Sequence, residues 1–213
     1  MQLSLDDVYL TQAERAVMAR DVHLLFAVRG PPGTHDLGLL ERTVQALSTA
    51  GPDDETLIPV FDKRTDDRAP LALWRRVRGR PGAVLIDGWC LGAKAQTLED
   101  LDTGLNRLER EQDWDGVWRG AVNAFTGGAY TALAHRLDQR VFLRAPGFET
   151  VLDWRCEQEE GLMGRALTPR ERDGVAGFIR HFERLTRHMI HGGVLADVTV
   201  QLDRNRLPVT ITP

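Results

Sequence analysis

The chain has 213 residues, of which 42% are hydrophobic and 27% charged, with a formal net charge of −4. These values are typical of a globular protein and exclude a disulfide mini-scaffold, wholesale disorder and a fibrous repeat. The acidic balance argues against a non-specific nucleic-acid binder, and no apolar run approaches the roughly 18 residues of a membrane span. The N-terminus lacks a signal-peptide pattern, so we expect a cytoplasmic protein that binds neither membrane nor nucleic acid.

Cysteine and lysine are both rare. Cys90 and Cys156 lie far apart and outside any CxxC motif, so we expect no structural zinc site. Arginine supplies almost all of the positive charge, because Lys63 and Lys94 are the only lysines. Each lysine therefore raises the question of why an ammonium group stands there.

Apolar runs and helical patterns alternate along the first half of the chain. The clearest strand is 83–86, four apolar residues between turn signals, and we expect it to be buried on both faces. The other expected elements are a strand ending near 3–5, a helix over 12–20 capped by Thr11, a turn-rich loop over 29–35, a helix over 36–47, a strand over 56–60, a charged loop over 62–67 and a short helix carrying Trp74.

The second half continues the alternation. Thr168, Pro169 and Glu171 form the start signal of a long helix to about Ile190. The other expected elements are helices over 98–111 and 117–137, the second interrupted at Gly127 and Gly128, a strand over 140–143, a helix over 148–162 and a strand over 197–202 paired with 207–211.

Strands separated by helices indicate βαβ units, so we predict an α/β fold: a parallel sheet covered by helices on both faces, in a single domain over 1–213. In such a sheet, ligands bind at the carboxyl ends of the strands. This rule places three acidic segments at one rim: Asp6-Asp7, Asp62-Lys63 and Asp87-Gly88-Trp89.

Three acidic strand ends are costly neighbours unless a cation neutralises them. Magnesium is the natural candidate, and magnesium sites usually serve phosphate transfer. Lys63 and Arg68 can hold an anionic substrate, arginine through its planar fork. Structural alternatives stay open: Asp7 and His35 as members of helix-capping turns, and Trp89 as a packing residue.

A charged stretch at 154–160 is followed by Arg165, Arg170 and Arg172. It is either a solvated helix face or a mobile helical lid near 155–172, whose arginines close over a phosphate chain. In the long helix that follows, His181, Arg184, Arg187 and His188 form a basic face, which is either solvated or lines the same cleft.

Several segments, in the same order along nearly the whole chain, resemble the D-glycerate 3-kinase family of the P-loop kinase superfamily, which is related to uridine kinase and phosphoribulokinase. The matching segments are Ser4-Leu-Asp-Asp-Val-Tyr-Leu-Thr11, Arg29-Gly-Pro-Pro-Gly-Thr-His-Asp36, Phe61-Asp-Lys63 with Asp66-Asp-Arg-Ala-Pro70, Asp87-Gly-Trp-Cys-Leu-Gly92, Val122-Asn123, Trp154-Arg-Cys-Glu-Gln-Glu159 and His181-Phe-Glu-Arg-Leu-Thr-Arg-His188.

The resemblance implies a kinase that transfers the γ-phosphoryl group of ATP to a hydroxyl of a small acid, D-glycerate being the family substrate. Asp6 and Asp87 are then the magnesium candidates, with Asp6 also able to accept the substrate proton. The resemblance assigns catalysis to Asp6, Asp87 and Lys63, the acceptor site to His35, Asp62, Arg68 and Trp89, and lid contacts with the nucleotide to Arg155 and Arg165.

Three positions or segments depart from the family pattern. Val8 replaces a usual phenylalanine, and Asp87 replaces a frequent glutamate, so its carboxylate is one methylene shorter. The third departure concerns phosphate binding: no GxxxxGK[ST] loop occurs in the sequence. We therefore expect a P-loop kinase-like fold that lacks the first strand and phosphate-binding loop, and poor ATP binding by this exact chain.

Two explanations of the missing loop are open: a reading frame that starts upstream of Met1, which we favour, or a truncated or degenerate family member. Two other functions also stay open. One is a non-catalytic, P-loop-less relative that binds a metabolite or partner, and the other is a kinase for another acceptor, such as a nucleoside, pantothenate or a sugar acid.

Overall fold

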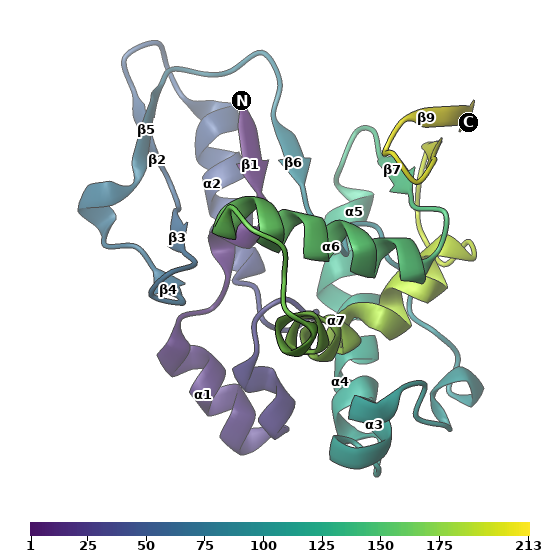
Figure 1. The fold of residues 1–213 in the computed structure, drawn as a ribbon. Helices are drawn as coiled ribbons and strands as arrows, with labels where there is room; N and C mark the ends of the chain where they lie inside the picture. The colour runs from purple at the N-terminus through teal and green to yellow at the C-terminus, as the bar shows by residue number, and fades with distance from the viewer. The chain divides into compact units, whose positions relative to one another are not determined.

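The computed structural model describes residues 1–213, which divide into two compact units, Met1–Leu91 and Gly92–Pro213 (Figure 1). Each unit is built from α-helices and short strands, and each contains a parallel strand pair. The α/β class with parallel pairing is therefore confirmed. The expectation of a single domain stays a prediction.

The parallel pair of the first unit joins the start of the chain to a segment more than eighty residues away. Strand β1 (Gln2–Ser4) runs beside β6 (Leu85–Asp87), with Ser4 opposite Asp87. From β1 the chain enters a 3₁₀ turn, η1 (Leu5–Val8), whose first and last residues are 1% exposed. Because its two ends are buried, η1 holds the acidic pair between them in fixed directions.

Strand β6 corrects the expectation for 83–86. The strand begins two residues later than predicted, and Leu85 is 66% exposed rather than buried on both faces. The reason is that β6 pairs only with β1 in this unit, so that its side chains are covered incompletely. An apolar run indicates a strand but not how many neighbours the strand has.

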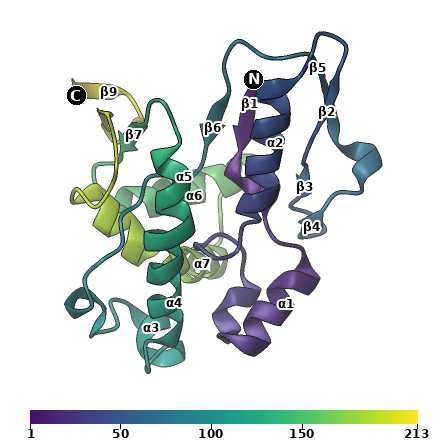
Figure 2. The ribbon, with the colours of Figure 1, turned by 180° about the vertical axis from the view of Figure 1, so that it is seen from behind.

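The helices of the first unit begin where local capping chemistry predicts. Thr11 forms a capping box with Glu14 at the start of α1 (Gln12–Asp21). A short 3₁₀ turn, η2 (Leu24–Ala27), follows. Asp36 accepts a 2.8 Å hydrogen bond from the Leu39 N–H at the start of α2 (Leu37–Thr49), and both views show α2 alongside β1 (Figures 1 and 2).

Two antiparallel pairs complete the first unit. Strand β2 (Glu55–Ile58) pairs with β5 (Arg75–Arg78), and β3 (Phe61–Asp62) pairs with β4 (Asp67–Arg68). The predicted charged loop over 62–67 is thus the tip of a hairpin. A 3₁₀ turn, η3 (Leu71–Leu73), replaces the predicted short helix, and Trp74 follows it directly.

The helical part of the second unit is more broken than predicted. The expected helix over 98–111 is a 3₁₀ turn, η4 (Glu99–Leu101), followed by the short helix α3 (Arg107–Gln112). The expected helix over 117–137 comprises α4 (Val117–Phe125), a π-helical turn η5 (Thr126–Tyr130) and α5 (Thr131–His135), which form one column in Figure 2. The glycine pair of the predicted interruption lies within the π-helical turn.

The remaining elements of the second unit agree with prediction. Helix α6 (Phe148–Met163) packs on α7 (Pro169–Ile190), which begins with the Thr168 capping box. Strand β7 (Val141–Arg144) runs parallel to β8 (Val198–Leu202), which pairs antiparallel with β9 (Pro208–Thr212). None of the helices combines the length and apolar character needed to cross a bilayer.

Gly92, the last residue of the Asp87–Gly92 segment, occupies a position that tolerates no side chain. Its φ is +78°, and a Cβ atom there would lie 2.6 Å from the Leu195 carbonyl oxygen. We expect Gly92→Ala to lower the free energy of unfolding by more than about 1 kcal/mol, measured by urea denaturation. Gly177→Ala, on α7 with open space around it, should leave stability equal or higher. If Gly92→Ala and Gly177→Ala had the same free energy of unfolding, this account of Gly92 would be wrong.

Candidate active site

The Asp6 carboxylate is held by two donors. Lys63 Nζ donates to Oδ2 at 2.6 Å, and the Tyr9 hydroxyl donates to Oδ1 at 2.7 Å. Ser4 caps the turn through a 3.3 Å hydrogen bond accepted from the Asp6 N–H. Burial raises the pKa of Asp6, but the hydrogen bonds from Lys63 and Tyr9 outweigh it, and the net pKa is below the ordinary value. Asp6 is therefore ionised at neutral pH.

His35, from a second segment of the chain, packs against Tyr9, the residue that donates to Asp6. Its ring stacks on Tyr9, with ring centroids 4.5 Å apart and an interplanar angle of 27°, and the two residues form an antiparallel β-bridge. Burial lowers the pKa of His35 to about 3, and the Asp6 charge opposes this shift only in part. His35 is thus neutral at physiological pH and offers no positive charge to an acidic substrate.

Arg68 reaches the same cluster from the hairpin. Its Nη2 donates to the Tyr9 carbonyl oxygen at 3.1 Å and to Asp36 Oδ2 at 3.4 Å. Its Nε is buried and has no hydrogen-bond partner. Such an unpaired buried donor is costly, so Arg68 is held at this position at the expense of stability.

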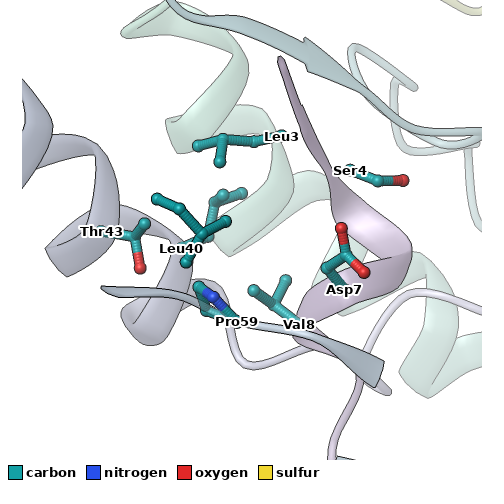
Figure 3. A pocket seen from close by; sticks show the side chains of 8 residues that line it. Leu3, Ser4, Asp7, Val8, Leu40, Thr43 and Pro59 are labelled. Atoms are coloured by element: carbon teal, nitrogen blue, oxygen red, sulfur yellow. The ribbon is translucent and has the colours of Figure 1, made fainter. Parts of the chain in front are cut away.

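Asp7, the neighbour of Asp6, has the opposite environment. It lines a small pocket together with apolar side chains of β1, η1, α2 and the end of β2, and Figure 3 shows its carboxylate near Ser4 and Val8, with Leu40 farther across the pocket. Burial raises the pKa of Asp7, opposed by a hydrogen bond from the Phe61 backbone. Asp7 lies inside η1, whose cap is Ser4, so the helix-cap interpretation of Asp7 is wrong.

Asp87 is linked to the cluster through β1. Its carboxylate accepts hydrogen bonds from the Ser4 hydroxyl at 2.8 Å and from the Gln2 side-chain amide at 3.0 Å. Ser4 therefore contacts both the Asp87 carboxylate and the Asp6 backbone. Two strand ends meet here, as the parallel-sheet rule predicts.

Two predicted acceptor-site residues are less closely tied to the cluster. Asp62 pairs with Arg64 at 3.2 Å, and hydrogen bonds from Arg64 lower the pKa of Asp62. Trp89 is partly buried beyond the end of β6. The structure thus gathers Asp6, Lys63, His35 and Arg68 around Tyr9, with Asp87 joined through Ser4, whereas Asp62 is engaged by its own loop.

The donor chemistry fits a magnesium ion better at Asp87 than at Asp6. Magnesium prefers carboxylate and hydroxyl oxygens and keeps several of its waters. Asp87 is exposed and carries the Ser4 hydroxyl beside it. Both carboxylates accept two hydrogen bonds, but the donors to Asp87 are neutral, whereas one donor to Asp6 is an ammonium group that a metal ion would have to displace.

The predicted lid arginines, in the second unit, are engaged in ion pairs. Arg155 pairs with Glu159 one turn along α6. Arg165, in the connection between α6 and α7, pairs with Glu171 at 2.6 Å. The predicted lid segment is therefore a helical hairpin whose arginines must exchange these partners before they can contact a phosphate.

Comparisons with known proteins find relatives that are named as kinases. No family model matches the chain. Over 99% of its length the chain is 28% identical to the uncharacterized kinase mug58 of Schizosaccharomyces pombe, and it covers 79% of that protein. Over 82% of its length the chain is 27% identical to the chloroplastic D-glycerate 3-kinase of Arabidopsis thaliana, and it covers 36% of that protein. The solved D-glycerate 3-kinase of Cryptococcus neoformans superposes over 99% of this chain and 78% of its own, with a TM-score of 0.76 and 22% identity.

The chain has the fold of this solved kinase, and the sequence relatives that it matches over 82–99% of its length are named as kinases. More particularly, its relatives in sequence and its neighbours in structure include D-glycerate 3-kinases. The predicted resemblance is confirmed at this level.

Sequence reasoning missed one residue of this cluster, Tyr9. A signal was available, because Tyr9 follows Asp6 by three positions at a 3₁₀ turn, where residues three apart lie above one another.

Proposed function

We propose that this protein transfers the γ-phosphoryl group of ATP to a hydroxyl of a small hydroxy acid, with D-glycerate as the first candidate. The observation that carries the proposal is the ionised Asp6 carboxylate paired with Lys63, while Arg68 reaches the adjoining Tyr9 backbone in the same unit. The D-glycerate 3-kinases among the relatives support this choice of substrate.

In this proposal the acceptor hydroxyl oxygen attacks the γ-phosphorus, the bond to ADP breaks, and the hydroxyl proton passes to Asp6. Lys63 and Arg68 oppose the acceptor carboxylate, as a lysine ammonium and an arginine fork can do. His35, Asp62 and Trp89 line the acceptor side. Phosphoryl transfer depends mainly on positioning and neutralisation of charge, which these groups supply.

Magnesium and the lid complete the proposed site. A magnesium ion held by Asp87, directly or through water, would neutralise charge on the phosphates. Arg155 and Arg165 would contact the phosphates after leaving Glu159 and Glu171. Asp6 fits the role of proton acceptor better than that of metal ligand, because the Lys63 ammonium at Oδ2 repels a metal ion but not a neutral hydroxyl, and Oδ2 keeps a second lone pair.

A second candidate is a non-catalytic protein that keeps the acceptor pocket and binds a metabolite. The observation that favours it is that the Asp6–Lys63–Tyr9 cluster is formed within these 213 residues, which contain no GxxxxGK[ST] loop. The backbone amides and lysine of such a loop hold the β- and γ-phosphates in P-loop enzymes. In this proposal Lys63 and Arg68 serve an acidic acceptor, so a neutral acceptor such as a nucleoside is disfavoured.

Calorimetric titration with D-glycerate, together with an ADP-release assay over D-glycerate, L-glycerate, pantothenate and uridine, tests these alternatives. We expect glycerate to bind and to be phosphorylated. Glycerate binding without turnover would favour the metabolite-binding protein. Turnover of uridine but not glycerate would refute the carboxylate argument, and no response to any acceptor would refute the acceptor site.

A further inference from the structure

Tyr9 contacts the segments that carry Asp6, His35, and Lys63 with Arg68. Its hydroxyl donates to Asp6 Oδ1 at 2.7 Å, and its ring stacks on His35. Its ring also meets Phe61 edge to face, at 5.2 Å between centroids and 74°, and Phe61 is two residues before Lys63. Its carbonyl oxygen accepts a hydrogen bond from Arg68 at 3.1 Å.

The position of the Tyr9 hydroxyl is fixed by its surroundings. Tyr9 is 6% exposed, and its ring lies between two other rings, which leaves it little freedom of rotation. A donor held so firmly orients the carboxylate that it contacts. With Oδ1 bound to Tyr9, Oδ2 of Asp6 points to Lys63, on the side where we place the acceptor.

We propose that Tyr9 is a positioning residue of the kinase reaction: it locks the Asp6 carboxylate in the rotamer that presents Oδ2 to the acceptor hydroxyl and to Lys63. This inference rests on the proposed function. Tyr9 does not touch the substrate; it acts through Asp6. A misplacement of the proton acceptor by about 1 Å is enough to slow a reaction about 100-fold.

Tyr9→Phe tests this role because it removes the hydroxyl and keeps the ring. We expect kcat for the acceptor to fall by about 10- to 100-fold, with the acceptor KM changed less than about twofold. Tyr130→Phe is the matched control, since Tyr130 is the only other tyrosine and is also buried, at 2% exposure, in the second unit. It should leave kcat and KM unchanged, whatever it does to stability.

A spectroscopic measurement tests Tyr9 without relying on activity. Because Lys63 and Lys94 are the only lysines, a ¹⁵N spectrum of the lysine ammonium groups at fixed pH contains at most two signals. Tyr9→Phe should shift or broaden the Lys63 signal, since Asp6 then holds Lys63 less firmly, and should leave the Lys94 signal in place. Lys63→Arg assigns the signals.

The outcomes separate this inference from the proposed function. If the wild-type chain shows no turnover but Tyr9→Phe alters the Lys63 signal, the kinase proposal fails for this chain. The contacts among Asp6, Tyr9 and Lys63 are then confirmed, but Tyr9 has no catalytic positioning role. If turnover is present and Tyr9→Phe changes neither kcat nor the Lys63 signal, the positioning role is wrong. Equal losses of kcat in Tyr9→Phe and Tyr130→Phe would also overturn it, because a general loss of stability would then explain both.

Discussion

Replacing Asp6 with asparagine should lower the turnover of the hydroxy acid by between about 100- and 10,000-fold, the range attributed to a positioned proton acceptor. Asparagine keeps the shape of the side chain and an oxygen for the Tyr9 hydroxyl, but it cannot take up the proton. The affinity for glycerate should stay equal or increase, because a negative charge beside the acidic acceptor is removed. Steady-state kinetics and glycerate calorimetry on the same preparation measure the two effects.

The matched control is Asp53→Asn, which removes an exposed carboxylate that pairs with Arg78 at the surface of the same unit. Both substitutions remove one negative charge and one exposed or half-exposed ion pair, which contributes little to stability. Only the Asp6 variant should lose turnover. A parallel loss of turnover and of glycerate affinity in Asp6→Asn would place Asp6 in binding rather than in proton transfer.

Local capping chemistry predicts where two helices of this chain begin. Thr11 and Thr168 each carry a glutamate three positions on, and both form the capping boxes that the pattern indicates. The pairing of strands that lie far apart in the chain is harder to predict from the sequence. Strand β5 consists of three arginines and a valine and was not among the predicted strands, because its strand character depends on pairing with β2, some twenty residues earlier.

The candidate site was predictable only in part, for a related reason. The rule that parallel strand ends meet brought Asp6 and Asp87 to one region, and the structure links them through Ser4. The rule does not give side-chain directions. Asp6 and Asp7 are adjacent and chemically identical, yet one accepts hydrogen bonds from Lys63 and Tyr9 and the other lines an apolar pocket, because a 3₁₀ turn directs successive side chains differently.

The basic face predicted on the long helix also has a different meaning in the structure. Arg184 on α7 binds both carboxylate oxygens of Glu109, at 2.8 and 2.7 Å, and Glu109 has no exposed surface. The same guanidinium donates to the carbonyl oxygens of Asp100 at 2.7 Å and Thr103 at 2.6 Å. Arg184 therefore joins α3 and the preceding loop to α7 and is not a solvated residue of the face.

Removing the Arg184 side chain should therefore lower the free energy of unfolding strongly. Arg184→Met leaves the buried Glu109 carboxylate without its cation, which costs about 3–5 kcal/mol of unfolding free energy, a large part of a typical domain's stability. Arg107→Met is the control, because Arg107 forms an exposed pair with Glu111 on the same helix as Glu109, and it should cost less than about 1 kcal/mol. Urea denaturation followed by tryptophan fluorescence measures both changes.

The double variant Arg184→Met with Glu109→Met separates the unpaired charge from lost packing. Because both charged groups are then gone, most of the stability lost in Arg184→Met should return. If the double variant is as unstable as Arg184→Met alone, the hydrogen bonds of Arg184 to the Asp100 and Thr103 carbonyls, rather than the ion pair, hold α7 to this part of the unit. Equal effects of Arg184→Met and Arg107→Met would refute the buried pair itself.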